Sequence, residues 1–239
     1  MEKASPKQQR VIVALDFPTI QTAESFLSLW DIEEKLFVKV GMQLFYTAGP
    51  TWVAKLVEQG YAVFLDLKLH DIPNTVAGAI RSLAHLGVKM ITLHAAGGRA
   101  MMEAAKEAAS QSAGLRLLAV TQLTSTDKYI LNEEIGIPGT VEESVGHYVK
   151  LAHTAGMDGV ICSGWEAPIV KTKAGKDFLV VTPGIRLPQS AIQDQKRVMT
   201  PDMAIQMGAD YIVVGRSITQ AADPLEAYQK IQEMVRCAI

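Results

Sequence analysis

Three polar side chains at alternate positions of one short stretch are the first candidates for chemistry in this sequence. Residues 62–75 read AVFLDLKLHDIPNT, in which an apolar run leads into Asp66, Lys68 and His70. Alternate residues of a β-strand share one face, so we expect these three side chains to point the same way. Polar groups on one face of a buried strand cost free energy unless they pair or take part in a reaction. The stretch is therefore a candidate reaction centre.

The same residues also allow a purely structural interpretation. Asp66 and Lys68 could form an ion pair at the end of a strand. Asp71 could then cap a helix that carries Pro73 in its first turn. Further polar residues beside this stretch would favour a reaction centre over the structural interpretation.

Lys39 comes in from the neighbouring apolar run and could join this stretch. With Asp66, Lys68 and Asp71 it would form a site of two ammonium groups and two carboxylates. Such a site could keep Lys68 charged as a general acid while it presents negative charge to a substrate. Two aspartates can also bind Mg²⁺ through their oxygens, although two nearby lysines would oppose the cation's charge.

The elements that must position these side chains follow from the apolar pattern. The third of eight apolar runs lies in residues 62–75, and the other strands are expected at residues 10–16, 36–41, 88–94, 115–121, 159–162, 178–182 and 211–214. Helical spacing follows each run, at residues 22–30, 49–60, 72–86, 97–112, 141–155, 165–172, 200–207 and 224–235. Runs that are apolar throughout are typical of a parallel sheet buried on both faces.

Eight such units predict an α/β fold, a (β/α)8 TIM barrel that forms a single catalytic domain over residues 1–239. An open, doubly wound sheet is the alternative. The chain is 49% hydrophobic and 20% charged with a formal net charge of −2, so we expect neither nucleic acid nor membrane as a partner. We expect no signal peptide, no apolar stretch reaches membrane-spanning length, and we expect a cytoplasmic location.

The sequence shows no signature of a disulfide framework, a zinc site or a nucleotide-binding site. The two cysteines, Cys162 and Cys237, are too few and too far apart for a disulfide framework or a zinc site. The chain has no GxGxxG fingerprint, P-loop or HExxH sequence. These absences suggest neither a nucleotide cofactor nor zinc.

Polar residues follow most of the expected strands, where a parallel barrel carries its active site. Besides the residues already named, these are Asp16, His94, Thr124, Arg186, Gln195, Gly215 and Arg216. Each has a plainer explanation alone: Asp16 could cap a helix, and His94 could be a hydrogen-bonded core histidine. Their common location favours a functional site.

The loops after the last two strands indicate a phosphate site. Gly184 and Arg186 follow the seventh strand, and Gly215 and Arg216 follow the eighth. Glycines let the backbone approach a ligand closely, and guanidinium groups make fork-like contacts with phosphate oxygens. We therefore expect a phosphorylated small-molecule substrate.

Residues 66–75, DLKLHDIPNT, resemble the DxKxxDIPxT signature of the orotidine 5′-phosphate decarboxylase family. Further motifs agree with that family in order and span nearly the whole chain. They are ALD at 14–16, FVKVG at 37–41, HAAGG at 94–98, VTQLTST at 120–126, VTPGIR at 181–186, DQKRVMTP at 194–201 and VVGRSIT at 213–219. The chain is most similar to the bacterial, single-function branch.

The resemblance implies a metal-free and cofactor-free decarboxylation of orotidine 5′-monophosphate to uridine 5′-monophosphate, the last step of pyrimidine synthesis. It implies that Lys39, Asp66, Lys68 and Asp71 form the catalytic charge network and that Lys68 protonates C6 of the pyrimidine. It also implies a homodimer in which Asp71, Ile72 and Thr75 complete the partner's site.

The resemblance assigns substrate contacts to further residues. Asp16 and Lys39 match ribose contacts, Thr124 matches a pyrimidine contact, and Gln195, Gly215 and Arg216 match the phosphate site. Arg186 lies in a matching motif, and His94 matches a position near the ribose. The whole of the signature is included, namely Asp66, Leu67, Lys68, Leu69, His70, Asp71, Ile72, Pro73, Asn74 and Thr75, with no catalytic role for His70. Residues 183–197 are the candidate lid.

Two other functions fit parts of the same pattern. The 3-keto-L-gulonate 6-phosphate decarboxylase and hexulose-phosphate synthase group resembles the DxKxxD motif but uses Mg²⁺, and it usually carries an acidic residue at the position of Lys39. A catalytically silent barrel that binds a phosphorylated ligand is the second. The intact set of two lysines and two aspartates argues against it.

Overall fold

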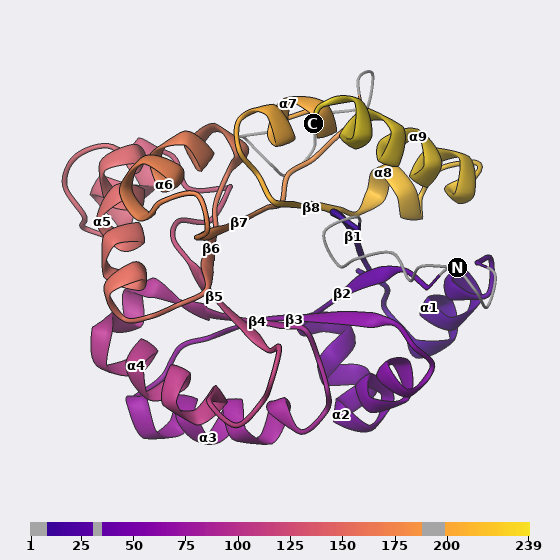
Figure 1. The fold of residues 1–239 in the computed structure, drawn as a ribbon, viewed down its shortest axis with the longest axis horizontal. Coiled ribbons are helices and arrows are strands. Elements are labelled where there is room, and N and C mark those ends of the chain that lie inside the picture. Colours follow the sequence, from indigo (N-terminus) through magenta and orange to yellow (C-terminus); the bar gives the residue numbers. More distant parts are fainter. Residues whose placement is uncertain (1–8, 31–34, 188–198) are drawn as a thin grey trace.

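The computed structural model describes residues 9–30, 35–187 and 199–239, and their strands form a closed parallel barrel in chain order (Figure 1). The strands are β1 Val11–Ala14, β2 Phe37–Gly41, β3 Ala62–Leu69, β4 Met90–His94, β5 Arg116–Val120, β6 Gly159–Ile161, β7 Leu179–Thr182 and β8 Tyr211–Val214. The predicted (β/α)8 TIM barrel is confirmed. That residues 1–239 form a single domain stays a prediction.

Helices surround the barrel on its outside (Figure 1). They are α1 Ile20–Leu27, α2 Met42–Glu58, α3 Pro73–Ala84, α4 Gly98–Ala109, α5 Val141–Thr154, α6 Ala167–Ala174, α7 Pro201–Gln206, α8 Arg216–Thr219 and α9 Pro224–Cys237. Short turns add Ala95–Gly97 and Gly164–Glu166 as 3₁₀-helix and Ile130–Glu134 as π-helix. Within the described residues, no helix is both long and apolar enough to cross a bilayer. The cytoplasmic location stays a prediction.

Two elements differ from the sequence prediction for local reasons. Gly49, with φ 71° and ψ 176°, divides α2 into two helical segments; the second is the predicted helix at 49–60, and the first, which begins at Met42, was not predicted. Pro50 then occupies the start of the second half, where its missing N–H costs nothing. The four-residue helix α8 was not predicted, because so short a segment carries no helical period.

The buried apolar residues form two separate cores on the two faces of the barrel wall. One lies between strands and helices and includes Val13, Val38 and Leu65. The other lies inside the barrel and includes Ile12, Phe37, Phe64, Met90, Leu118, Val120, Ile161, Val181 and Val213. Because successive strand residues alternate between the two cores, every position is apolar, which explains the continuous apolar runs.

The inward-facing rows of several strands end in polar or small residues. Two positions beyond an inner-core residue stand Asp16 after Ala14, Lys39 after Phe37, Asp66 after Phe64, Thr92 after Met90, Gln122 after Val120 and Gly215 after Val213. The alternation that builds the inner core therefore also directs these residues toward the C-terminal mouth of the barrel.

Candidate active site

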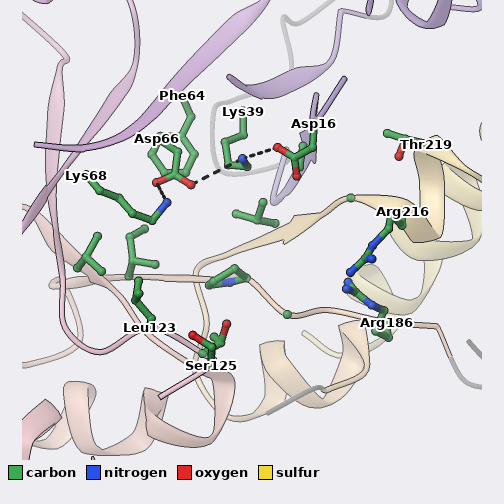
Figure 2. Close-up of a pocket in the computed structure, with 18 of the residues that line it drawn as sticks. Asp16, Lys39, Phe64, Asp66, Lys68, Leu123, Ser125, Arg186, Arg216 and Thr219 are labelled. Atoms are coloured by element: carbon green, nitrogen blue, oxygen red, sulfur yellow. Dashed lines mark hydrogen bonds and ion pairs between the residues drawn. The ribbon is translucent and has the colours of Figure 1, made fainter. Parts of the chain in front are cut away.

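A pocket of about 620 Å³ lies at the C-terminal mouth of the barrel, within the size range of small-molecule sites (Figure 2). Its lining includes apolar residues of the inner core: Ala14, Phe64, Val120, Ile161 and Val213. Charged residues and the segments after β1, β5, β6, β7 and β8 complete the lining. The pocket therefore offers an apolar floor beneath a polar rim.

Four charged side chains form a continuous row along one side of this pocket (Figure 2). The Lys39 Nζ lies 3.0 Å from Oδ1 of Asp16 and 3.6 Å from Oδ2 of Asp66. The Lys68 Nζ lies 2.8 Å from Oδ1 of Asp66. Positive and negative groups alternate, so each charge is compensated by its neighbours.

The middle of this row is the most buried part. The side chains of Lys39 and Asp66 are 10% and 14% exposed, against 61% for Asp16. Burial alone would raise the pKa of Asp66, but the charges of Lys39 and Lys68, with hydrogen bonds from Lys68 and Thr92, hold this pKa below its usual value. Asp66 is therefore a carboxylate at neutral pH.

Gly41, at the end of β2, leaves room for the ion pair beside it. A Cβ at this position would lie 3.0 Å from Lys39 Nζ and 3.4 Å from Asp16 Oδ1. A larger residue would thus press on the pair. The glycine of the FVKVG motif has a steric role that sequence reasoning did not assign.

The strand pattern of β3 breaks at the catalytic candidates. Its pairing with β4 shifts register between Leu65 and Leu69, and Lys68 has a φ of 51°. The alternation therefore holds for Asp66 and Lys68, which meet as an ion pair, but fails for His70. His70 lies beyond the end of the strand and is exposed, with its ring centroid 5.4 Å from that of His94.

His94 does not line the pocket, and neither does His70. Burial lowers the pKa of His94, and repulsion by His70 and Lys68 adds to the effect, against an opposing contribution from Asp66. His94 is therefore neutral at pH 7. A neutral, half-buried imidazole beside the row fits a supporting position rather than a direct substrate contact.

The rest of the signature lies outside this pocket. Leu67 and Leu69 pack in the outer core and do not line the pocket, and their role as substrate contacts stays a prediction. Residues 70–75 are all exposed, including Ile72 at 67%. Asp71 accepts a hydrogen bond from the Ile72 N–H at 2.7 Å and forms no ion pair with any described residue. Pro73 opens α3 as predicted, but Ile72, not Asp71, is the capping residue.

Two guanidinium groups lie at the other end of the pocket. Arg186, after β7, and Arg216, at the start of α8, point toward each other at the end of the pocket opposite Lys68 (Figure 2). Gly184 and Gly215 line the pocket beside them. Gln195 lies outside the described residues, as does most of the candidate lid at 183–197.

The loop after β5 closes a third side with Gln122, Leu123, Thr124 and Ser125. The Gln122 Nε2 donates a buried hydrogen bond of 3.0 Å to Ser144 Oγ on α5, which anchors the loop. Of these residues, sequence reasoning named only Thr124. It also missed Phe64 and Thr92, although each stands two positions before a named residue and so shares its strand face.

The arrangement suits an anionic ligand with two separated charges. The row Asp16–Lys39–Asp66–Lys68 is neutral overall, whereas Arg186 and Arg216 add two positive charges at the far end. No group of three or more His, Cys, Asp or Glu side chains that could hold a metal ion occurs among residues 9–30, 35–187 and 199–239.

The chain is similar to known proteins over almost its whole length. Residues 9–231 match the model of the orotidine 5′-phosphate decarboxylase / HUMPS family. The orotidine 5′-phosphate decarboxylase of Geobacillus thermodenitrificans is 55% identical over 226 residues, which cover 92% of this chain and 94% of the relative. That of Streptococcus thermophilus is 51% identical over 226 residues, covering 95% and 97%.

Solved structures agree with these sequence matches. The crystal structure of orotidine 5′-phosphate decarboxylase from Lactobacillus acidophilus superposes with a TM-score of 0.85 at 43% identity, covering 95% of this chain and 99% of that one. An uncharacterized conserved protein from Geobacillus kaustophilus superposes with a TM-score of 0.83 at 50% identity, covering 94% and 99%.

Proposed function

Because this chain belongs to the orotidine 5′-phosphate decarboxylase / HUMPS family, we propose that it is a carboxy-lyase that converts orotidine 5′-monophosphate to uridine 5′-monophosphate and CO₂. The observation that carries this proposal is the row of alternating charges facing two guanidinium groups across one pocket (Figure 2). The substrate has a phosphate at one end and a carboxylate on its pyrimidine at the other, so its charges match the two ends.

In the proposed pose the phosphate lies between Arg186 and Arg216, near the backbone of Gly215. Guanidinium forks suit such a dianion better than single ammonium groups. The ribose then lies near Asp16 and Lys39, and the pyrimidine extends toward Lys68 with Thr124 at its edge. Gln195 is proposed for the phosphate from the family resemblance alone, since it lies outside the described residues.

The proposed reaction breaks the bond between C6 and the carboxylate carbon. CO₂ leaves, the electron pair stays on C6, and a proton from the Lys68 ammonium forms the new C6–H bond. Solvent then reprotonates Lys68. A catalyst for so demanding a step must supply stabilisation of about 20 kcal/mol. An ammonium held in place by Asp66 is the kind of preorganised electrostatic group that contributes strongly to that total.

Asp66 has a second role in this mechanism. Its carboxylate, ionised and mostly buried, would face the carboxylate of the bound substrate. Repulsion between the two is relieved when neutral CO₂ leaves, which favours the transition state over the bound substrate. Contacts to the distant phosphate would supply the binding energy that offsets this repulsion.

We propose that the reaction needs no metal ion. The Lys39 Nζ lies between the carboxylates of Asp16 and Asp66, at 3.0 Å and 3.6 Å, where a bound cation would otherwise bridge them. Lysine at this position also distinguishes the chain from the Mg²⁺-dependent decarboxylases and synthases on the same barrel. The neutral charge balance of the row would be lost if a divalent ion were added.

We propose a homodimer in which Asp71, Ile72 and Thr75 reach the partner's site. Six consecutive exposed residues after β3, including an apolar side chain at Ile72, support this proposal. Asp71 lacks an ion-pair partner among the described residues of its own chain, which leaves its carboxylate available to a second copy. Asp71, Ile72 and Thr75 do not line the pocket of their own chain, and the dimer would give them a role in the partner's pocket.

One assay separates the three candidate functions. The decrease in ultraviolet absorbance as orotidine 5′-monophosphate is consumed should proceed at the same rate with and without excess EDTA. Loss of activity in EDTA that added Mg²⁺ restores would identify a metal-dependent decarboxylase. Binding of the nucleotide without any turnover would identify a silent barrel.

A further inference from the structure

Thr92 is a fully buried polar residue on β4 whose hydroxyl group joins two parts of the charge row. Its Oγ1 lies 3.0 Å from Oδ1 of Asp66 and 2.8 Å from the backbone nitrogen of Lys68. It does not line the pocket, so it does not reach a ligand there. Neither the resemblance nor the pattern of charges draws attention to it.

The direction of both hydrogen bonds is fixed by their partners. A backbone N–H can only donate, so the Thr92 oxygen accepts from Lys68. An ionised carboxylate can only accept, so the Thr92 hydroxyl donates to Asp66. The Thr92 hydroxyl group thus donates one hydrogen bond to Asp66 and accepts one from Lys68. Hydrogen bonds linked in this way polarise and strengthen one another.

The backbone of β3 explains why Lys68 needs such a partner. The pairing with β4 runs from Leu65↔Ile91 to Leu69↔Leu93, so β3 advances four residues while β4 advances two. Within this irregular segment Lys68, with φ 51°, is the one non-glycine residue at positive φ in the part of the chain that the structure describes. A regular ladder does not supply its N–H with an acceptor, and Thr92 does.

Thr92 thereby helps to fix both the backbone and the side-chain ammonium group of Lys68. It binds the backbone of Lys68 directly, and through Oδ1 of Asp66 it binds the carboxylate that contacts the Lys68 ammonium at 2.8 Å. The unusual backbone conformation is kept only if the surroundings fix it. The same contact limits rotation of the Asp66 carboxylate, whose other oxygen faces Lys39.

We propose that Thr92 is a positioning residue for catalysis: its hydroxyl holds the Lys68 backbone at positive φ and orients the Asp66 carboxylate, so that the Lys68 ammonium stays in place for proton transfer. The inference rests on the proposed decarboxylation. It predicts a role in the chemical step with little effect on nucleotide binding, since Thr92 lies outside the pocket.

The first test compares Thr92→Val, which keeps the shape and removes the hydroxyl, with Thr92→Ser, which keeps the hydroxyl. Loss of a hydrogen bond to a charged group corresponds to a fall in kcat of about 10- to 100-fold in Thr92→Val. KM should stay within about threefold, and Thr92→Ser should recover most of kcat. Thr92→Ala and Thr92→Ser form a second pair that differs by the hydroxyl alone and adds no bulk.

Thr121→Val is the matched control. Thr121 is also buried, and its hydroxyl donates a 3.0 Å hydrogen bond to the Ile161 carbonyl without touching Asp66 or Lys68. It should lower the thermal midpoint as Thr92→Val does but leave kcat near that of the unchanged protein. Equal losses of kcat in both valine variants would mean that any buried hydroxyl matters, and this would overturn the inference.

A crystal structure of Thr92→Val gives a readout that does not depend on turnover. Lys68 should leave its positive φ, and its Nζ should move away from Asp66. An unchanged Lys68 in that structure would overturn the inference even if the unchanged protein decarboxylates its substrate. Absence of decarboxylation by the unchanged protein would instead reject the proposed function, while the displacement of Lys68 would still support the positioning role.

Discussion

The Nζ of Lys68 lies 2.8 Å from Oδ1 of Asp66, although the two residues belong to the same strand and Lys68 has a left-handed backbone. The ammonium is thus attached to a carboxylate that is itself mostly buried and ionised. A positive group held in this way cannot easily move toward solvent. Catalysis by a fixed ammonium follows from this contact if the proposed function is correct.

Lys68→Ala should nearly abolish decarboxylation, because it removes both the proton donor and the positive charge near C6. We expect kcat to fall by at least about 10³-fold while uridine 5′-monophosphate still binds. Stopped assays and calorimetric titration with the nucleotide would measure the two effects. Lys106→Ala is a suitable control, since Lys106 pairs with Asp158 at 2.9 Å outside the pocket. Retained turnover in Lys68→Ala would rule out the proton-donor assignment.

Asp66→Asn should lower the free energy of unfolding as well as the rate. The change keeps the shape of the side chain but leaves Lys39 and Lys68 without their shared counter-charge. We expect a loss of about 1–3 kcal/mol in urea denaturation at neutral pH. Glu24→Gln breaks the exposed pair with Lys55 at 3.0 Å and should cost less than about 1 kcal/mol. Equal losses in the two variants would contradict the buried pair's importance.

Arg216→Ala should raise KM for the nucleotide by about 10- to 100-fold, as expected for lost hydrogen bonds to a charged phosphate. Arg216→Lys should recover only part of the loss, because an ammonium lacks the planar fork. The unphosphorylated nucleoside gives a sharp control. If Arg216 binds the phosphate, its removal should not change the slow reaction of orotidine, and a matching loss on both substrates would assign Arg216 another role.

Because of His94, the folded protein should be less stable in mild acid than at neutral pH. Its folded-state pKa lies below the usual 6.5, so between these two values the unfolded chain binds more protons than the folded one. The contribution of His94 to stability is therefore present above 6.5 and is lost as the pH falls toward the folded-state pKa. Urea midpoints at about pH 7.5 and about pH 5.5 should differ less in His94→Gln than in the unchanged protein.

The matched variant for this comparison is His147→Gln, because His147 is exposed on α5. It should keep the pH dependence of the unchanged protein. An identical dependence in His94→Gln would show that His94 does not contribute.

Mixing two inactive variants tests the proposed dimer. Lys68→Ala and Asp71→Ala should each be inactive, but a mixed dimer would hold one site with both Lys68 and Asp71. After equal amounts are mixed and re-equilibrated, half of the dimers are mixed, so activity should recover to about one quarter of that of the unchanged protein. No recovery, with subunit exchange verified, would place Asp71 in the site of its own chain or in none.

Much of the fold could be predicted because its signals are local. The eighth strand was expected at residues 211–214 and is found at Tyr211–Val214, since a run of one tyrosine and three β-branched residues between Asp210 and Gly215 has few other interpretations. The partnership of Lys39 with Asp66 was also expected, because charges on neighbouring buried strands must compensate one another. Both predictions needed only residue type and strand order.

The parts that sequence reasoning missed depend on contacts between strands. Thr92 stands in an apolar strand and has no charge, so its two hydrogen bonds become visible only when β3 and β4 are paired in their shifted register. The expectation for His70 assumed strict alternation, whereas His70 lies beyond the end of β3 and does not line the pocket. Asp16, expected as a ribose contact, also binds Lys39, a contact that the expected order of strands left open.

The positions of Asp16, Lys39 and Asp66 have a consequence for the evolution of such proteins. Each of these residues stands two positions after an inner-core residue of a different strand, above a floor that other residues build. A substitution at one of them alters the reaction without opening a cavity in either core. A single ancestral barrel could therefore acquire a new chemistry one strand at a time and remain folded at every intermediate stage.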